Sequence, residues 1–234
     1  MSLDEVADDV FVARTGLVNW LLVREGRHVL AIDSGYPAAA EEFMRSVTRV
    51  GGMGSQLTAA IITHGHADHQ GGLAEARPRV PIYAHRDELG NARRDVLHQV
   101  NARALGARLL APRVAVWAVR AIRHGGLRHC PVPAVAPHGG LANLPGAPRI
   151  IHSPGHTPGH VAVAIDDRRV LATGDALISE HPCLPRRDHV RGGELPAHFH
   201  SDPCQASVSA SRLRGAASDY LHVPGHGAPY VLTV

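Results

Sequence analysis

Three histidines and an aspartate share one six-residue stretch, His64-Gly65-His66-Ala67-Asp68-His69. Imidazole nitrogens and carboxylate oxygens bind divalent metals, and one short loop brings these groups close together. The alternating His64 and His66 can face one ion while Asp68 and His69 face a second. Chance places such a pattern in a chain of this composition about half a percent of the time. The motif therefore indicates a metal site more strongly than a polar surface loop.

Three more candidate ligands follow in the second half of the chain, and each lies beside a glycine. They are His156 in the stretch SPGHTPGH, Asp175 in TGDAL and His226 in PGHG. A neighbouring glycine lets the backbone turn sharply and bring a side chain close to a buried ion. Each motif is weak alone. Their order after the first motif, each behind an apolar strand-like segment, makes them specific together.

The composition narrows the kind of site. The 234 residues include 18 histidines but only three cysteines, which are widely spaced. This disfavours a disulfide framework or a thiolate zinc finger and points to imidazole ligands. The net charge of +3 comes mostly from scattered arginines and indicates a solvated surface rather than a nucleic-acid site. No apolar segment approaches the ~20 residues of a membrane helix and no secretory signal is visible, so we expect a cytoplasmic protein.

Apolar segments separated by turn residues predict the elements that must position these side chains. The predicted strands cover residues 10–13, 17–23, 28–33, 57–63, 80–84, 149–153, 161–165, 169–173 and 220–223. The predicted helices cover residues 38–50, a short segment after Gly71-Gly72, and residues 203–215. We interpret residues 86–129 as a helical insert and 131–148 as a Pro/Gly-rich connection. Two β-rich halves with helices outside each predict a layered α/β sandwich, formed by a single domain over residues 1–234.

These motifs resemble those of the metallo-β-lactamase superfamily, and the resemblance covers nearly the whole chain. LVNW at 17–20 and AIDSG at 31–35 look like the family's opening strands, and THGHADHQGG at 63–72 looks like its signature loop. SPGHTPGH, TGDAL and PGHG look like its third, fourth and fifth motifs. The resemblance implies a four-layer αββα sandwich with metals at one edge of two facing sheets.

The resemblance also implies how the candidate ligands divide between two ions. The first ion would be bound by His64, His66 and His156, and the second by Asp68, His69 and His226. Asp175 would bridge the two ions. Asp33 would bind no metal, but would hold a ligand imidazole in the required tautomer.

The ligand set bears on the identity of the metal. A bridging aspartate resembles glyoxalase II and the lactonases more than the antibiotic-degrading members of the superfamily. The redox-active di-iron members typically carry glutamate at the second ligand position, where this chain has His66. We therefore expect two zinc ions per chain, with iron or manganese as alternatives.

Two close divalent ions lower the pKa of a shared water and so favour a hydrolase. The expected reaction is attack of a metal-bound hydroxide on a small ester-like bond, in a thioester, a lactone or a related carbonyl substrate. Asp68 and Asp175 are the expected catalytic carboxylates, Asp68 as a proton shuttle. The sequence stops shortly after PGHG, where glyoxalase II relatives continue, and it has no tyrosine between Tyr83 and Tyr220, where lactonases carry one. These departures leave the exact substrate open.

Other enzyme classes stand as alternatives. Mononuclear-iron persulfide dioxygenases share these motifs but continue differently after TGDAL, where this chain reads ISEHPC at 178–183. Phosphodiester and β-lactam hydrolysis are further alternatives within the superfamily. The expected partner is a small-molecule substrate, with no nucleic acid and no membrane, and the sequence leaves the oligomeric state open.

Some residues outside the ligand set are candidates for contact with substrate. His181 lies shortly after TGDAL, where a substrate loop is expected. Trp117 either lines a substrate groove or anchors its helix, and the apolar segment Leu105–Ile122 is interpreted as a lid. Weaker candidates for substrate contact are His160, His85, His198 and His200.

Overall fold

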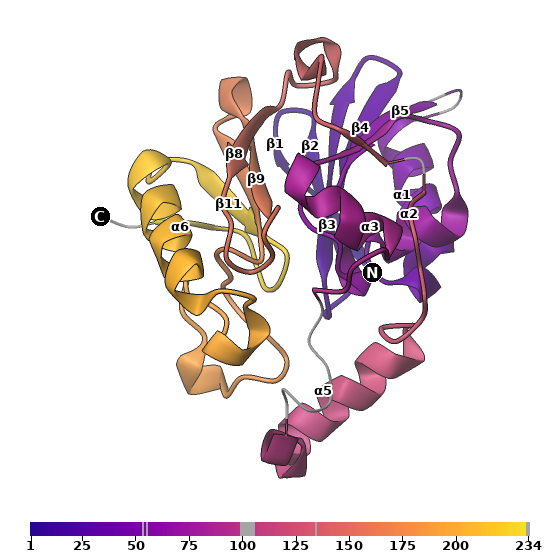
Figure 1. The fold of residues 1–234 in the computed structure, drawn as a ribbon. Helices are drawn as coiled ribbons and strands as arrows, with labels where there is room; N and C mark the ends of the chain where they lie inside the picture. Colours follow the sequence, from indigo (N-terminus) through magenta and orange to yellow (C-terminus); the bar gives the residue numbers. More distant parts are fainter. Residues whose placement is uncertain (53, 55, 99–105, 134, 233–234) are drawn as a thin grey trace.

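The computed structural model describes residues 1–52, 54, 56–98, 106–133 and 135–232. Two β-sheets face each other, and helices cover the outer side of each sheet (Figure 1). This arrangement confirms the four-layer αββα sandwich that the motifs predicted.

The larger sheet has seven strands that follow one another in chain order. Its first four strands pair antiparallel, and the strands from β4 to β7 pair parallel. The strands are β1 Ser2–Ala7, β2 Val10–Arg14, β3 Asn19–Glu25, β4 His28–Ile32, β5 Gln56–Ile61, β6 Ile82–Ala84 and β7 Val135–Pro137.

The smaller sheet has five strands in the order β12-β11-β10-β9-β8. β10 and β11 pair parallel, and the other neighbours pair antiparallel. The strands are β8 Arg149–His152, β9 Val161–Ile165, β10 Val170–Gly174, β11 Leu221–Pro224 and β12 Tyr230–Val231.

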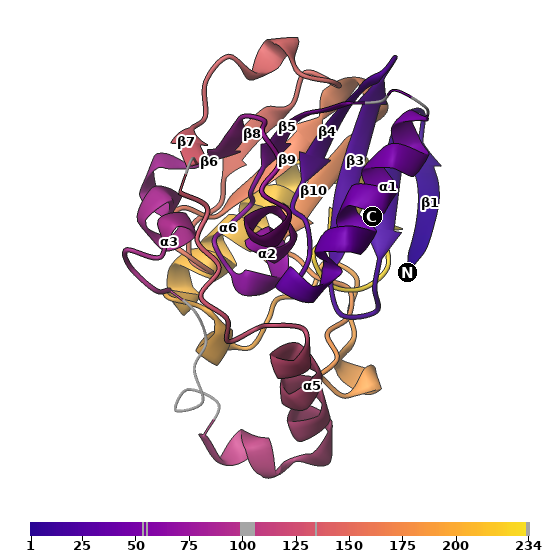
Figure 2. The same cartoon turned by 90° about the vertical axis from the view of Figure 1, so that its right-hand side faces the viewer.

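The helices form the outer layers. α1 and α2 lie on the outer face of the large sheet, and α6 lies on the outer face of the small sheet (Figures 1 and 2). The helices are α1 Ala40–Gly51, α2 Ala67–Ala76, α3 Leu89–Arg93, α5 Pro112–Arg123 and α6 Pro203–Ala216.

Three apolar clusters fill the spaces between the four layers. Trp20 and Phe43 belong to the cluster between the large sheet and α1, with their rings edge to face and their centroids 6.1 Å apart. Leu21 belongs to the cluster between the two sheets. Leu171 and Leu213 join the small sheet to α6. Because successive strand residues point to opposite faces, the neighbours Trp20 and Leu21 belong to different clusters.

The strand directions bring the candidate ligands to one edge of the sandwich. β4 and β5 are parallel, so Asp33 and His64, which follow them, lie at the same edge. β10 and β11 are also parallel, which places Asp175 near His226. β8 runs in the same direction as β10, because both pair antiparallel with β9, and it leads to His156. The carboxyl ends of strands are where open α/β sheets bind ligands.

The predicted short helix after Gly71-Gly72 was placed too late in the chain. α2 begins at Ala67, inside the histidine motif, and contains both glycines. A Cβ atom on Gly71 would lie 2.3 Å from Pro37 Cδ, and one on Gly72 would lie 2.2 Å from the carbonyl oxygen of Ser34. The two glycines therefore allow α2 to pack directly against the turn after β4.

Three strands were not predicted from the sequence. β1 lies in the acidic N-terminal segment, β7 lies in the predicted connection, and β12 has two residues. All three are edge strands. An edge strand pairs on one side only and needs no continuous apolar pattern, so these segments carried no clear signal.

The segment predicted as a helical insert contains α3 and α5, while its residues 99–105 lie outside the described part of the chain. α5 projects below the body of the sandwich (Figure 2). Pro112 begins this helix rather than interrupting it, because the first helical turn does not use the missing N–H. None of the described helices is long and apolar enough to cross a membrane.

Candidate metal centre

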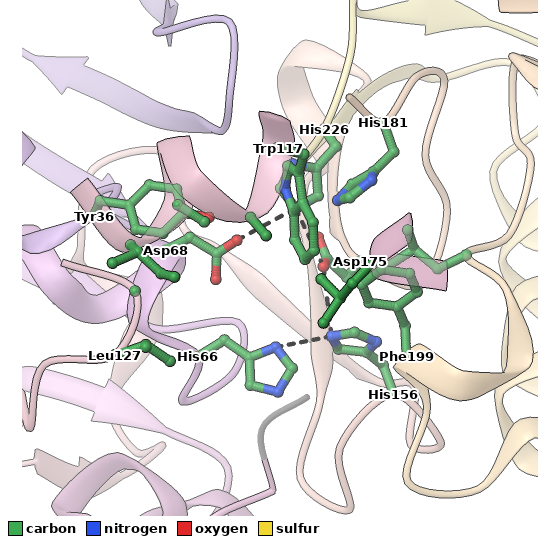
Figure 3. Close-up of a pocket in the computed structure, with 16 residues that line it drawn as sticks. Tyr36, His66, Asp68, Trp117, Leu127, His156, Asp175, His181, Phe199 and His226 are labelled. Carbon is green, nitrogen blue, oxygen red and sulfur yellow. Dashed lines mark hydrogen bonds and ion pairs between the residues drawn. The ribbon is translucent and has the colours of Figure 1, made fainter. Parts of the chain in front are cut away.

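The structure brings all seven predicted ligands together at the sheet edge. They form two groups, and within each group the ligand atoms lie within 4.8 Å of one another. The first group is His64, His66, His156 and Asp175, and the second is Asp68, His69 and His226. All are buried except Asp68, which is partly exposed. The family resemblance implied the same division for the five histidines and Asp68, whereas Asp175, expected to bridge two ions, is grouped here with the first set. Figure 3 shows His66, Asp68, His156, Asp175 and His226 converging on one region.

Asp175 lies between the two groups. Its Oδ1 is 3.2 Å from Nε2 of His69. Its Oδ2 is 3.4 Å from Nε2 of His156 and 3.4 Å from Nε2 of His226. This position would let a single carboxylate contact two ions.

The imidazoles of the second group are oriented by acceptors outside the cluster. Nδ1 of His69 donates to Oδ2 of Asp33 at 2.8 Å. Nδ1 of His226 donates to the carbonyl oxygen of Leu17 at 2.6 Å. A neutral imidazole carries one hydrogen, so each of these bonds leaves Nε2 with a free lone pair directed at the cluster.

Two imidazoles of the first group are likewise oriented by a hydrogen bond on the outer ring nitrogen. Nε2 of His66 donates to the carbonyl oxygen of His98 at 2.5 Å, which leaves the lone pair on Nδ1. The Thr63 hydroxyl donates to Asp33 at 2.7 Å and therefore accepts from Nδ1 of His64 at 3.1 Å. His64 thus presents Nε2 to the cluster as a lone pair.

His156 is oriented by a second histidine. Nε2 of His200 donates to the carbonyl oxygen of Leu195 at 2.8 Å, so its Nδ1 is an acceptor. Nδ1 of His156 donates to that atom at 3.3 Å. Nε2 of His156 is then a lone pair, and it lies 3.1 Å from the lone pair on Nδ1 of His66. Two such nitrogens repel each other unless a positive charge lies between them.

The polar atoms inside the cluster fit a cation. His64 Nε2, His69 Nε2 and Asp175 Oδ1 are buried and have no hydrogen-bond partner among the described residues, although buried polar atoms are normally satisfied. Burial disfavours a charged imidazole, yet the carboxylates of Asp175, Asp33 and Asp68 raise the pKa of His69 well above its usual value. The cluster therefore attracts positive charge at Nε2 of His69, where a metal ion would replace the proton that the carboxylates otherwise favour.

The backbone at Asp33 and at Gly225 has a local geometry that the cluster requires. Asp33 has a φ of 62°, a left-handed conformation that aspartate tolerates better than most residues, and its Oδ1 accepts the Thr63 backbone N–H at 2.8 Å. Gly225 precedes the last ligand of the second group. A Cβ atom there would lie 2.5 Å from Oδ1 of Asp175 and 2.6 Å from Cε1 of His69, so only glycine fits.

A cavity of about 190 Å³ opens over the cluster, and α5 contributes to its wall. Trp117 of α5 contacts Phe199 with ring centroids 5.7 Å apart. No lysine or arginine is found among the described residues that line this cavity. Its apolar lining consists of Leu109, Trp117, Ala118, Ala121, Ile122, Leu127, Leu195 and Phe199.

The cavity contains a tyrosine that the sequence motifs did not reveal. No tyrosine lies between Tyr83 and Tyr220, but the turn after β4 brings Tyr36 beside Asp68 (Figure 3). Tyr36 is 5% exposed. Burial and the charges of Asp68 and Asp175 raise the pKa of its hydroxyl, which therefore stays protonated.

His181, which the sequence made a candidate for substrate contact, is among the residues that line the cavity. Its ring centroid lies 4.7 Å from that of His226 and 5.3 Å from that of Trp117. Its Nδ1 accepts the backbone N–H of Cys183 at 3.3 Å, so Nε2 carries the hydrogen. Burial lowers the pKa of His181 well below its usual value and keeps the ring neutral. His181 thus offers one hydrogen-bond donor to the cavity.

The weaker histidine candidates have other positions. His200 supports the first group from outside, as described above. Nε2 of His160 accepts the backbone N–H of Asp175 at 3.1 Å, and burial lowers its pKa to about 3. His85 and His198 are not among the described residues that line the cavity. Sequence reasoning did not single out Thr63, which accepts from His64, or the carbonyl groups of Leu17 and His98, which accept from His226 and His66.

Two facing sheets with outer helices and a histidine–aspartate cluster at their edge define a metallo-hydrolase type of fold and site. The sequence model of the family described as "Metallo-beta-lactamase superfamily" matches residues 13–226. The chain belongs to this superfamily, which confirms the resemblance drawn from its motifs.

Individual relatives agree with this assignment. The probable metallo-hydrolase YflN of Bacillus subtilis (strain 168) is 30% identical over 221 residues, which cover 89% of this chain and 78% of that protein. Hydroxyacylglutathione hydrolase of Cupriavidus taiwanensis is 29% identical over 200 residues, covering 84% of this chain and 58% of that protein. Among solved structures, TTHA1623 in a di-iron-bound form has a TM-score of 0.59 and 26% identity, covering 94% of this chain and 93% of that one.

Proposed function

We propose that this metal-dependent hydrolase binds two zinc ions and cleaves a small, uncharged ester-like substrate, such as a thioester, a lactone or a related carbonyl compound. In this proposal the ligands of the first ion are His64, His66 and His156, and those of the second are Asp68, His69 and His226. Asp175 would be available to both ions, and Asp33 would orient His69.

One observation carries the proposal of metal binding. Nδ1 of His66 and Nε2 of His156 lie 3.1 Å apart, and the bonds on the far side of each ring leave both nitrogens without a hydrogen. Two nitrogens that each lie about 2.1 Å from a tetrahedral zinc ion are separated by roughly 3.4 Å. The spacing therefore fits two imidazoles that share one ion.

The donor set favours zinc without requiring it. Five imidazoles and two carboxylates, with no thiolate among the described residues of the cluster, suit zinc and also accept iron or manganese. The similar structure in a di-iron-bound form makes iron the first alternative. Elemental analysis separates these metals directly.

The surrounding residues supply the remaining chemistry. Two bound ions would provide Lewis acidity and lower the pKa of water toward neutrality. The side chain of Asp68 is 19% exposed and lines the cavity, so it can accept a proton there and return it to a leaving group. The Nε2–H of His181 can donate a hydrogen bond to a substrate oxygen on the opposite side, beside His226.

The cavity wall supports an uncharged substrate with an apolar acyl group. β-Lactam antibiotics and glutathione thioesters carry anionic groups away from the bond that is cleaved, and such groups are costly to bury against a wall that offers no cationic side chain among its described residues. The described lining offers aromatic and aliphatic side chains instead, such as Trp117 and Phe199. Esters and lactones with an apolar chain fit this wall better than these anionic alternatives.

The test combines metal analysis with a substrate panel. Protein purified without added metal should contain close to two zinc ions per chain. The panel comprises p-nitrophenyl esters from acetyl to octanoyl, γ-lactones, a glutathione thioester, a β-lactam and a phosphodiester. We expect kcat/KM to rise along the ester series by about two- to fourfold per methylene until the cavity is filled. Trp117→Ala should flatten this rise, because it removes the largest apolar side chain of the wall.

Val208→Ala, at a position that is 54% exposed on α6, is the matched control and should keep the wild-type chain-length dependence. A rate independent of chain length in the wild type, or a preference for the anionic substrates, would overturn the substrate proposal. A single iron without zinc, together with oxygen consumption on a persulfide, would favour the dioxygenase alternative.

A further inference from the structure

Glu88 is a fully buried carboxylate that lies outside the ligand set and accepts four hydrogen bonds. Its Oε1 accepts the backbone N–H of Gly65 at 2.8 Å and the side-chain amide of Asn91 at 2.6 Å. Its Oε2 accepts the hydroxyl of Thr157 at 2.7 Å and the backbone N–H of Gly159 at 3.0 Å. A buried carboxylate with four donors is fully satisfied, and each such charge-assisted bond is stronger than a neutral one.

Three of these donors, Gly65, Thr157 and Gly159, belong to the two loops that carry the histidines of the first group. Gly65 stands between His64 and His66, and Thr157 directly follows His156. The contact with the second loop is close, because a Cβ atom on Gly159 would lie 2.3 Å from the backbone nitrogen of Glu88. One carboxylate thus joins two loops that lie about ninety residues apart in the sequence and on different sheets.

A second path leads from Glu88 to the outer nitrogen of His66. Asn91 binds Glu88 through its amide nitrogen, and its amide oxygen accepts the backbone N–H of His98 at 3.1 Å. The carbonyl oxygen of His98 then accepts Nε2 of His66 at 2.5 Å. Glu88 therefore helps to fix the loop that carries His66. Through Asn91 and His98 it also supports the carbonyl group that holds the hydrogen of His66 on Nε2.

The second group of candidate ligands is held by other residues. His69 and His226 are oriented by Asp33 and by the carbonyl oxygen of Leu17. The loop of His226 is fixed by Asn19, whose amide donates to the carbonyl oxygens of residues 224 and 227 at 2.9 and 2.7 Å. None of the hydrogen bonds described for Glu88 reaches this group.

We propose that Glu88 is a positioning residue that sets the geometry of the first metal position and leaves the second largely unaffected. This inference rests on the proposed two-ion centre. It predicts a loss of metal affinity that is confined to the position formed by His64, His66 and His156.

The test is Glu88→Gln, which keeps the shape of the side chain but replaces one acceptor oxygen with a donor. Zinc affinity is measured by chelator competition in three backgrounds: wild type, His226→Ala and His66→Ala. We expect Glu88→Gln to weaken binding about 10- to 100-fold in wild type and in His226→Ala, as is usual for groups that support metal ligands. In His66→Ala, where the first metal position has already lost a ligand, Glu88→Gln should weaken zinc binding little further.

A milder variant guards against a general folding defect. Thr157→Val removes one of the four bonds to Glu88 and should weaken the same position to a smaller degree. Equal losses in the His226→Ala and His66→Ala backgrounds would overturn the positioning role, as would wild-type affinity in Glu88→Gln. A wild-type chain that binds no metal would instead overturn the two-ion proposal on which the inference rests.

Discussion

Replacing Asp33 with asparagine exchanges a single oxygen for an NH₂ group and tests how the candidate ligands are oriented. Asparagine tolerates the φ of 62° at this position, so the backbone should not change. Oδ1 of Asp33 accepts the Thr63 backbone N–H, and Oδ2 accepts both the Thr63 hydroxyl and Nδ1 of His69. The backbone N–H can only donate, so the amide oxygen must stay beside it. The amide nitrogen then takes the place of Oδ2.

The new amide nitrogen should reverse the hydrogens of two imidazoles. Nδ1 of His69 would have to accept, so its hydrogen moves to Nε2, which faces Oδ1 of Asp175 at 3.2 Å. The Thr63 hydroxyl would also have to accept from the amide, and it would then donate to Nδ1 of His64 at 3.1 Å. Both rings would present an N–H where the two-ion proposal requires a lone pair.

The expected loss of metal affinity in Asp33→Asn depends on how many ligands change their tautomer. Loss of the outer partner of one ligand weakens metal binding about 10- to 100-fold. Because His64 and His69 belong to different groups, we expect both metal positions of Asp33→Asn to be weakened by this factor. The free energy of unfolding of the metal-free chain should fall by about 1–3 kcal/mol, because a buried charge-assisted bond is replaced by a neutral one.

The assays are chelator competition for zinc and urea unfolding of the metal-stripped protein. Asp166→Asn is the matched control, since Asp166 pairs with Arg149 at the surface and should leave zinc affinity unchanged. Wild-type affinity of Asp33→Asn for both ions would contradict the proposed role of Asp33. Weakening at one position alone would show that the Thr63 hydroxyl does not transmit the change to His64.

Two further predictions concern residues that are not proposed ligands. His181→Ala removes a hydrogen-bond donor from the cavity, so steady-state kinetics should show a raised KM or a changed substrate preference, with unchanged zinc content by elemental analysis. Loss of zinc from this variant would place His181 among the ligands instead. Alkylation at mildly alkaline pH should modify the exposed Cys204 and preserve activity, because Cys183 is buried and burial raises the pKa of its thiol to about 12. Inactivation with both ions retained, and with Cys183 identified by mass spectrometry as the modified residue, would point to a cysteine nucleophile.

The seven clustered side chains could be chosen from the sequence because their signals are local. Four lie in one motif that comes shortly after an apolar strand, and the other three stand beside glycines, as His226 does in PGHG. Parallel neighbouring strands end at the same edge of a sheet, so strand ends that are distant in the sequence converge in space. The layered fold was predictable for a similar reason, since the alternation of apolar segments already determines which faces must be buried.

Other features were decided by the tertiary structure alone. Tyr36 lies far from the metal motifs in sequence, and it reaches Asp68 only because Gly71 and Gly72 allow α2 to pack against the turn after β4. Glu88 reads as one more charged residue in a helix-prone insert, yet it is buried between two loops.

The tautomers of the imidazoles were equally invisible in the sequence. His66 and His226 are oriented by the carbonyl oxygens of His98 and Leu17, and every residue type carries such an oxygen. Residue types and spacing therefore determined which side chains gather at the sheet edge. The direction in which each lone pair points was decided only by folding, because it depends on which backbone groups the packed loops bring against the outer side of each ring.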